Sequence, residues 1–425
     1  MDSGLKSYRA ALDELFARTG STSKFGLERT FAFLELLGNP HEKIKTFHVA
    51  GTNGKGSVVA TLYALLRSKN LSVGRYMSPH LIDFRERIVI DDAMVDEKYV
   101  VDFLERWSPQ AEELGATFFE ITTAMAFDFF ASRNVDIAVI ETGLGGRLDS
   151  TNVIKPIVAG ITSIAIEHTA YLGKTEGEIA REKAGIFKPG IPSVIGDMST
   201  NARVAIYESA AEHGVAAVVD STRLFKTTDV RVAAHGTSFT IRQGGESARL
   251  TTGLVGAAQA SNAAVALAML RSAGAPWSVS LEEAAQVLPS VLLPGRFQLR
   301  GNYILDVAHN PDGVRSLVAT LKQVKPAEPL TVVVGVLKDK DWRQMLSLLG
   351  EVADRIVLVE PPSAPADRAW DVNEAHAFAG TVKIAASIGS NFAQTVTDAG
   401  ASSGTAIITG SFHTVGDALQ VIKVA

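Results

Sequence analysis

The chain has 425 residues, of which 46% are hydrophobic and 20% are charged, and its 41 basic and 46 acidic residues give a formal net charge of -5. This length exceeds what one hydrophobic core usually holds, so we expect two domains, and the composition excludes a disordered or coiled-coil protein. The charge offers no general field for nucleic acid, and the lack of cysteine excludes disulfides, catalytic thiolates and cysteine-bound zinc.

The first residues do not resemble a targeting signal. Residues 1–6 lack the apolar core of a signal peptide, and no apolar run along the chain approaches the length that spans a membrane. We therefore expect a cytoplasmic protein with no membrane partner and no nucleic-acid partner.

Residues 51–57, Gly-Thr-Asn-Gly-Lys-Gly-Ser, are the most informative stretch of the chain. They lie between a strand pattern at residues 44–49 and a run in which apolar residues recur at helical spacing. Glycines let backbone N–H groups close on phosphate oxygens, and a helix N-terminus favours negative charge. The pattern therefore predicts a phosphate-binding loop, in which Lys55 reaches the outer phosphates and Ser57 holds Mg²⁺.

This loop departs from the common phosphate-loop pattern. That pattern places a glycine where Val49 stands and a hydroxyl directly after the lysine, where Gly56 stands. A glycine-rich turn without a ligand is the alternative, and the strand and helix on either side favour nucleotide binding.

The following segments predict an α/β layer. Continuous apolar runs at residues 135–140, 157–162 and 193–195 are typical of strands that are covered on both faces, which indicates a mainly parallel sheet. Residues 228–252 have the alternation of a β-hairpin excursion.

A Pro-Gly breaker at residues 294 and 295 follows a helical pattern at residues 281–287, and we place a domain boundary there, between 1–292 and 293–425. Beyond it, strand patterns alternate with helices such as the one at residues 314–322. The second domain is therefore expected to be a smaller Rossmann-like α/β unit. Its predicted strands are residues 303–305, 331–334, 355–359 and 405–408.

Polar residues that follow apolar runs mark candidate sites, because ligands of open α/β sheets bind at the carboxyl ends of the strands. Glu141 ends one run and precedes a glycine-rich stretch, so we expect it to contact the Mg²⁺ of a nucleotide, with a turn carboxylate as the alternative. His168 follows another run, but a lone histidine there is more often structural. Lys183 lies on a helix that a capping box at residues 175–178 opens, and the pattern alone indicates a solvated charge.

Two charged residues are candidates in the second domain. Asp306 ends a strand and is followed by His309-Asn310-Pro311. The acid is placed to accept from a ribose hydroxyl, and the equal alternative is that Asn310-Pro311 only begins a turn. Arg296 in the hinge clamps a phosphate or is an exposed linker residue.

Together these residues resemble the folylpolyglutamate synthase and dihydrofolate synthase family within the Mur ligase superfamily. The resemblance covers nearly the whole chain, with motifs in the same order. They are residues 51–57, 76–81, 141–152, His168 with 181–186, Gln259 with Asn262, 293–298 and 306–311.

The resemblance implies a mainly parallel N-terminal ATPase domain with a Rossmann-like C-terminal domain, acting as an ATP-dependent amide ligase. ATP converts a carboxylate of a reduced folate or of dihydropteroate to an acyl phosphate, which the amine of L-glutamate attacks, and ADP and phosphate leave. Positioning and charge neutralisation then carry the catalysis. The family also implies a monomer.

Carried over position by position, the resemblance implies two Mg²⁺ sites and a carbamate on Lys183, whose new carboxylate supports the second metal ion. The implied catalytic residues are Lys55, His168, Lys183 and Arg296, and the implied metal ligands are Ser57, Ser78, Glu141, His168 and Lys183. The implied ATP contacts are Thr52, Asn53, Gly54, Lys55, Gly56, Ser57, Asn262, Arg296 and Asp306.

The resemblance also implies the substrate contacts. Three segments match the pteroate-binding segments of the family, although their phenylalanines are equally consistent with a core. They are Phe25, Gly26 and Leu27; Thr117, Phe118, Phe119 and Glu120; and Leu148, Asp149 and Ser150, with His309 and Ser411 as candidates for the incoming glutamate.

Two other kinds of protein are alternatives, one from the same superfamily and one from another class. Ligases of peptidoglycan precursors carry a nucleotide-sugar domain ahead of the phosphate loop, and the 50 residues before Gly51 are expected to be too few for one. A protein that only changes shape with ATP is the second alternative. It does not require strand-end residues such as Asp306 and His309 in a second domain.

Overall fold

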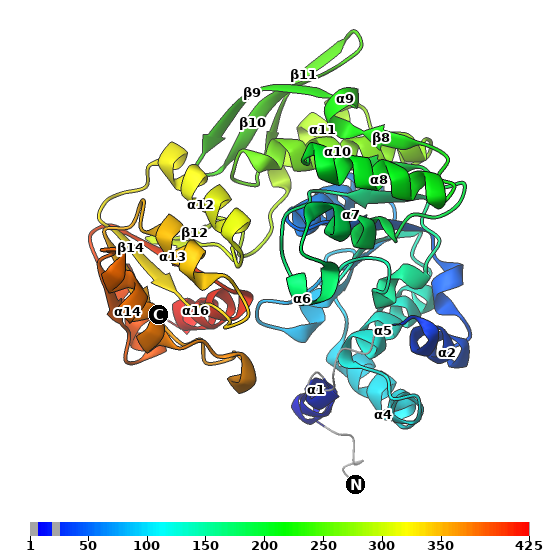
Figure 1. The fold of residues 1–425 in the computed structure, drawn as a ribbon. Coiled ribbons are helices and arrows are strands. Elements are labelled where there is room, and N and C mark those ends of the chain that lie inside the picture. The colour runs from blue at the N-terminus through cyan, green and yellow to red at the C-terminus, as the bar shows by residue number, and fades with distance from the viewer. Residues whose placement is uncertain (1–6, 19–25, 425) are drawn as a thin grey trace. The chain divides into compact units, whose positions relative to one another are not determined.

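The computed structural model describes residues 7–18 and 26–424, and Figure 1 shows the course of the chain. The chain forms two compact units, each assembled from segments that are not continuous in sequence. The first contains Arg85–Lys226 and Ser261–Val287 together with the chain up to Pro79, and the second contains His80–Phe84, Thr227–Ala260 and the chain from Leu288. The predicted boundary between residues 292 and 293 divides the chain into two continuous segments, and it stays a prediction.

The first unit contains an eight-stranded sheet in the order β4-β3-β2-β5-β1-β6-β7-β8. From β2 to β8 all neighbours are parallel, and β3 and β4 extend one edge antiparallel. The prediction of a mainly parallel sheet is confirmed. Its strands are β1 (Thr46–Ala50), β2 (Val73–Tyr76), β3 (Ile88–Ile90), β4 (Ala93–Met94), β5 (Ile137–Glu141), β6 (Val158–Ile161), β7 (Ser193–Ile195) and β8 (Val218–Asp220).

Helices cover this sheet on both faces. Successive residues of a strand point to opposite faces. On β6, Ala159 and Ile161 pack into a core with α7 and α8, whereas a Cβ atom on Gly160 would lie 2.4 Å from the sulfur of Met269 on α10. The helices with most or all of their residues in this unit are α1 (Tyr8–Ala17), α2 (Glu28–Leu36), α3 (Lys55–Arg67), α4 (Glu97–Glu113), α5 (Phe118–Ser132), α6 (Thr169–Leu172), α7 (Glu176–Ala184), α8 (Thr200–Glu212), α9 (Ser221–Leu224), α10 (Ala258–Ala273) and α11 (Leu281–Val287).

The second unit contains a six-stranded sheet in the order β12-β13-β17-β14-β15-β16, parallel apart from β12. Val332 and Val334 of β14 pack into one core and Val333 into another, which explains why three successive residues of the strand are apolar. The elements are β12 (Gln298–Arg300), β13 (Tyr303–Leu305), β14 (Leu330–Val334), β15 (Arg355–Leu358), β16 (Ala386–Ile388), β17 (Thr405–Thr409), α12 (Pro311–Val324), α13 (Trp342–Leu349), α14 (Val372–Thr381), α15 (Phe392–Gly400) and α16 (Phe412–Val424).

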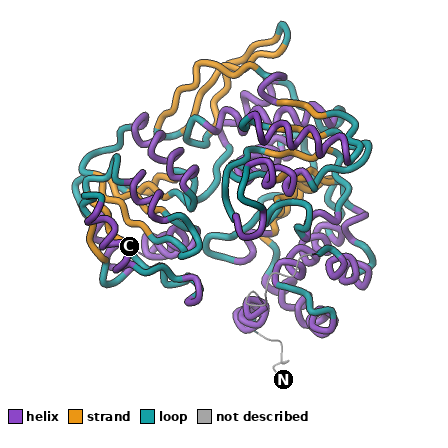
Figure 2. The backbone as a smooth tube through the Cα atoms, viewed as in Figure 1, coloured by secondary structure: helices purple, strands orange, loops and turns teal. Residues whose placement is uncertain are grey.

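The predicted β-hairpin excursion has three strands rather than two. β9 (Lys226–Ala233), β10 (Gly236–Gln243) and β11 (Glu246–Thr252) form a separate sheet in the order β11-β10-β9, in which β10 and β11 are antiparallel (Figure 2). In the described part of the chain, no helix is both long and apolar enough to cross a membrane.

Candidate functional site

The predicted phosphate loop lies between the carboxyl end of β1 and the start of α3. Gly54 is the N-cap of α3 with φ 87°, a left-handed conformation that glycine adopts at little cost. A Cβ atom there would lie 2.5 Å from Oδ1 of Asn262, so Asn262 packs directly against the loop. The N-cap residue Gly54 has no side chain that could cap the first N–H groups of α3, and N–H groups at the start of a helix are what a phosphate binds.

The segment after β6 fixes the shape of this loop. The Thr52 N–H donates to the carbonyl of Ser163 at 2.8 Å. The carbonyl of Asn53 accepts from the hydroxyls of Thr162 at 2.6 Å and Ser163 at 3.0 Å. The loop is therefore held in place by the protein itself.

Lys55 and Ser57 occupy the first turn of α3. The Lys55 ammonium group donates to the carbonyls of Gly51 at 2.9 Å and Thr52 at 3.2 Å, so its charge lies across the loop. Ser57 is buried. The structure therefore places both residues at the loop, and it also brings Asn262 to it from α10.

Glu141 and Ser78 come together at the carboxyl edge of the sheet. Glu141 is the last residue of β5 and is 4% exposed, and its carboxylate accepts from the Ser78 N–H at 3.3 Å.

His168 is the N-cap of α6 with φ 48°, a conformation uncommon for residues other than glycine.

Lys183 is buried, contrary to the prediction that the sequence pattern alone gave. Its ammonium group donates to the Gly51 carbonyl at 2.8 Å and lies 3.3 Å from a carboxylate oxygen of Glu167. Burial lowers the pKa of Lys183 to about 8, and Glu167 opposes this shift. The helix pattern could not reveal this burial, because it depends on the packing of α7 beside the phosphate loop.

Among the described residues, no three side chains of histidine, cysteine, aspartate or glutamate are grouped so that they could hold a metal ion. A cation at Glu141 would therefore need ligands of other kinds. Mg²⁺ suits such a place, because it commonly keeps several waters and binds one or two carboxylates with substrate phosphates.

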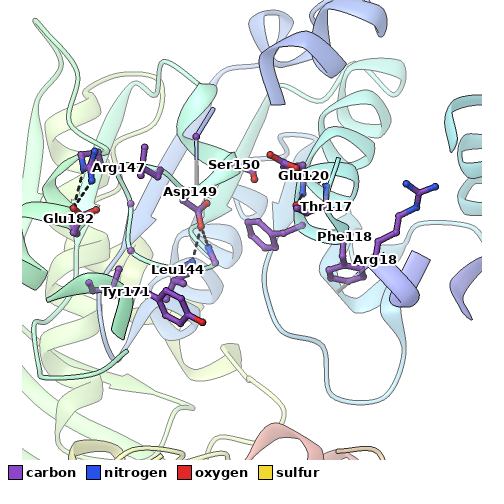
Figure 3. Close-up of a pocket in the computed structure, with 17 residues that line it drawn as sticks. Arg18, Thr117, Phe118, Glu120, Leu144, Arg147, Asp149, Ser150, Tyr171 and Glu182 are labelled. Carbon is purple, nitrogen blue, oxygen red and sulfur yellow. Dashed lines mark hydrogen bonds and ion pairs between the residues drawn. The ribbon is translucent and has the colours of Figure 1, made fainter. Parts of the chain in front are cut away.

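The first unit also contains a pocket of about 410 Å³, drawn in Figure 3. The structure brings eight of the predicted pteroate-binding residues into its wall, whereas Leu27 is not in the wall and Phe25 lies outside the described residues. The predicted residues in the wall are Gly26, Thr117, Phe118, Phe119, Glu120, Leu148, Asp149 and Ser150.

Sequence reasoning missed the other residues of this wall as substrate contacts. Only the glycines after Glu141 gave a signal, since they leave room for a ligand. The missed residues are Arg18, Gly143, Leu144, Gly145, Gly146, Arg147, Tyr171, Leu172 and Glu182.

Asp149 uses its carboxylate inside the protein. One carboxylate oxygen accepts from the N–H groups of Gly143 and Leu144, both at 2.8 Å. The other accepts from the N–H and hydroxyl of Thr151. Burial raises the pKa of Asp149, and these hydrogen bonds oppose the shift. Asp149 therefore shapes the glycine-rich stretch that lines the pocket.

Glu120 links the start of α5, which is one of the predicted substrate segments, to helix α2. It is 3% exposed, and its carboxylate accepts from the Thr117 N–H at 2.7 Å, which completes a capping box at the start of α5. Its other oxygen lies 3.0 Å from the guanidinium of Arg29 on α2. The start of α2 and the start of α5 are thus held together beside the pocket.

Helix α7 lies against both the pocket and the phosphate loop. Glu182 lines the pocket and pairs with Arg147 at 2.9 Å, and its carbonyl accepts from the Arg147 N–H at 2.8 Å. The next residue, Lys183, donates to Gly51 of the phosphate loop. Two neighbouring residues of one helix therefore contact the two sites, Glu182 the pocket and Lys183 the phosphate loop.

In the second unit, Arg296 and His309 both face the ring of Phe412. The Arg296 guanidinium lies 5.3 Å from the centre of that ring, and the rings of His309 and Phe412 are 5.7 Å apart. The structure thus brings two predicted site residues together at the start of α16.

Asp306 and Ser411 have structural partners in the same unit. The carboxylate of Asp306 accepts from the N–H groups of Phe297 and Ala308, both at 2.9 Å, and burial raises the pKa of Asp306. The Ser411 hydroxyl accepts from the Thr414 N–H at 3.1 Å, as an N-cap of α16 does. These contacts leave their predicted ligand roles untested.

Two family models match the chain. The Mur ligase middle domain matches residues 49–270, and the glutamate ligase domain of Mur ligases matches residues 295–412.

Curated proteins give matches over most of the chain. The folylpolyglutamate synthase of Lacticaseibacillus casei is 35% identical over 350 residues, which cover 79% of this chain and 81% of that protein. The dihydrofolate synthase/folylpolyglutamate synthase of Escherichia coli (strain K12) is 34% identical over 427 residues, covering 99% of this chain and 96% of that protein.

Solved structures share the fold. Escherichia coli FolC in complex with DHPP and ADP has a TM-score of 0.86 and 30% identity, covering 99% of this chain and 98% of that chain. The folylpolyglutamate synthase of Mycobacterium tuberculosis complexed with ADP has a TM-score of 0.86 and 31% identity, covering 98% of this chain and 99% of that chain.

Proposed function

We propose a mechanism from the premise that the chain belongs to the folylpolyglutamate synthase and dihydrofolate synthase family of Mur ligases. It is an ATP-dependent ligase that adds L-glutamate to folates. The roles of individual residues, the use of dihydropteroate as a second acceptor, the metal ions and the assembly state are our proposals.

The observation that carries the mechanism is the position of α7. Glu182 lines the pocket that we assign to the folate, and Lys183 beside it donates to the phosphate loop. This arrangement supports a substrate carboxylate that lies next to the terminal phosphate of ATP. Holding two reactants in this way converts their encounter into an intramolecular step.

In the first step a carboxylate oxygen of the folate attacks the γ-phosphorus of ATP, the bond to the bridging oxygen breaks, and ADP leaves. In the second step the neutral amine of L-glutamate attacks the acyl carbon. The carbon–oxygen bond to phosphate then breaks, and the amine loses a proton. Lys55 and the N–H groups at the start of α3 stabilise the charge that the transferring phosphoryl group carries.

We assign a wider set of contacts to the same nucleotide. Thr52, Asn53, Gly54 and Gly56 present backbone of the loop, and Asn262 packs against Gly54. Arg296 and Asp306 as nucleotide contacts, and His309 and Ser411 as glutamate contacts, stay predictions that variants of each residue must test.

Mg²⁺ would be held by Ser57, Ser78, Glu141, His168 and, once it carries a carbamate, Lys183. It supplies positive charge that neutralises the phosphates, and Glu141 with the adjacent Ser78 offers oxygen ligands of the kind that it prefers. We propose two such sites.

The lowered pKa of Lys183 favours a carbamate on this side chain. Because burial lowers the pKa of Lys183 to about 8, much of the amine is neutral at mildly alkaline pH, and the neutral amine is the form that reacts with CO₂. The product is a carboxylate close to Glu167, so the two negative charges require a cation between them. Rescue of Lys183→Ala by small carboxylates such as formate would support this role, and failure of any carboxylate to restore turnover would count against it.

We propose that dihydropteroate is accepted as well as reduced folate. The pocket of about 410 Å³ is in the size range of small-molecule sites and is lined by aromatic and glycine residues that suit a flat heterocycle. Names of similar proteins include both activities.

Mass spectrometry of the products tests the function. Dihydropteroate and tetrahydrofolate are each incubated with ATP, Mg²⁺ and L-glutamate, with Lys55→Ala as a control, and ADP release is followed in parallel. We expect a product that has gained one glutamyl residue, and ADP release that requires both co-substrates. ADP release without a glutamylated product would favour the protein that only changes shape with ATP.

We also propose that the protein acts as a monomer in the cytoplasm, where ATP is available. Light scattering during size-exclusion chromatography would measure the mass of the assembly. A mass of two chains would overturn the monomer.

A further inference from the structure

One wall of the pocket is formed by an aromatic side chain that the sequence did not single out. Tyr171 lines the pocket together with its neighbour Leu172, and it is 52% exposed. A large ring that is half exposed at the wall of a cavity still has apolar surface that a ligand can cover. Leu172, in contrast, is 5% exposed and belongs to the core beneath.

The backbone that carries Tyr171 is fixed by the fold. The N–H groups of Tyr171 and Leu172 both donate to the carbonyl of His168, at 2.8 and 3.0 Å, and close the single turn of α6. Leu172 packs against the glycine-rich stretch, since a Cβ atom on Gly145 would lie 2.9 Å from it. The backbone is therefore in place before a ligand arrives, which reduces the entropy lost on binding.

Tyr171 lies at a defined end of the pocket. Figure 3 shows it beside Leu144, toward the Arg147–Glu182 pair, whereas Thr117, Phe118 and Glu120 lie at the other end. We take the end that contains Glu182 to be the end nearer the phosphate loop, because the next residue on α7, Lys183, donates to Gly51. The reacting carboxylate of a substrate must therefore point toward the end that holds Tyr171.

We propose that Tyr171 packs against the aminobenzoyl ring of the substrate, next to the carboxylate that is activated, and so determines affinity and orientation for ring-bearing acceptors. The pteridine then occupies the end formed by the start of α5. The inference rests on the proposed function, since it takes the pocket to be the site of the pteroate group. Aromatic pairs of this kind prefer offset or edge-to-face contact.

Binding measurements with three variants test the inference. Isothermal titration with dihydropteroate, in the presence of saturating ADP that cannot phosphorylate it, gives the affinity without turnover. Tyr171→Ala removes the ring, and Tyr171→Phe keeps the ring but loses the hydroxyl. Tyr207→Ala is the matched control, because Tyr207 on α8 is also exposed, at 36%, and is not in the wall of the pocket.

We expect Tyr171→Ala to raise the Kd for dihydropteroate about tenfold, as loss of an aromatic contact does. Tyr171→Phe and Tyr207→Ala should stay within about twofold of the unchanged protein, and the KM for ATP should be the same in all four. Unchanged affinity in Tyr171→Ala, or an equal loss in Tyr171→Phe, overturns the inference. If the unchanged protein binds neither dihydropteroate nor tetrahydrofolate, the proposed function fails instead.

Discussion

The ion pair between Glu120 and Arg29 allows the link between stability and substrate binding to be tested. Glu120 is nearly inaccessible to solvent and Arg29 is about one fifth exposed, so the pair is only partly screened by water. Replacing Glu120 by glutamine keeps the shape of the side chain and an oxygen for the Thr117 N–H, so the capping box can survive. What is lost is the negative charge that faces the guanidinium.

The size of the loss follows from this geometry. Hydrogen bonds to charged groups contribute about 1.5–3 kcal/mol. Breaking a fully buried pair costs about 3–5 kcal/mol, and the partial exposure of Arg29 places this pair below that range. We therefore expect Glu120→Gln to lower the free energy of unfolding of the first unit by about 2 kcal/mol. For a unit of its size this corresponds to a fall in Tm of about 4–8 °C.

The assay is a thermal melt of the unchanged protein, Glu120→Gln, Arg29→Gln and the double variant. Because the two side chains interact directly, the double variant should lose less than the sum of the two single variants. Steady-state kinetics should show a raised KM for the pteroate substrate and an unchanged KM for ATP, since Glu120 lines the pocket. Strict additivity of the losses, or an unchanged Tm in Glu120→Gln, would refute the reasoning.

Three further predictions concern the phosphate loop and the strand before it. Lys55→Ala should reduce turnover by at least about a hundredfold with an unchanged Tm, because it removes the positive charge that stabilises the transferring phosphoryl group. Near-normal ADP release would contradict this. Gly54→Ala should abolish nucleotide binding in equilibrium dialysis, because its Cβ atom would meet Asn262 at a left-handed position; binding within twofold of normal would show that the loop adapts. Burial lowers the pKa of His48 to about 3, so the histidine of the unfolded chain is protonated first as the pH falls below about 6.5. The free energy of unfolding should therefore drop by up to about 1.4 kcal/mol per pH unit between pH 6.5 and 3. In urea titrations of His48→Gln that part of the pH dependence should vanish, and an identical pH dependence would rule His48 out as its cause.

The α/β class and the phosphate loop both follow from local patterns in the sequence. Apolar runs such as residues 135–140 are continuous because both faces of the sheet are covered, and this is a local signal that can be read along the chain. The loop at residues 51–57 is equally local, because its glycines, lysine and hydroxyl act within one turn between β1 and α3. The resemblance of ordered motifs then extended these signals to eight of the residues that line the substrate pocket.

Other features were decided only by the tertiary structure. A lysine on a helix is usually solvated, and the pattern alone indicated this for Lys183, whereas the packing of α7 beside Gly51 buries it. No sequence pattern predicted Tyr171 as a pocket residue, because its place in the wall depends on where α6 lies in the folded unit. Asp149 lies in the wall of the pocket as predicted, and nothing in the sequence indicated that its hydrogen bonds also tie together the backbone of a glycine-rich stretch. In each case the outcome depends on residues distant in sequence or on backbone geometry, and local patterns carry no information about either.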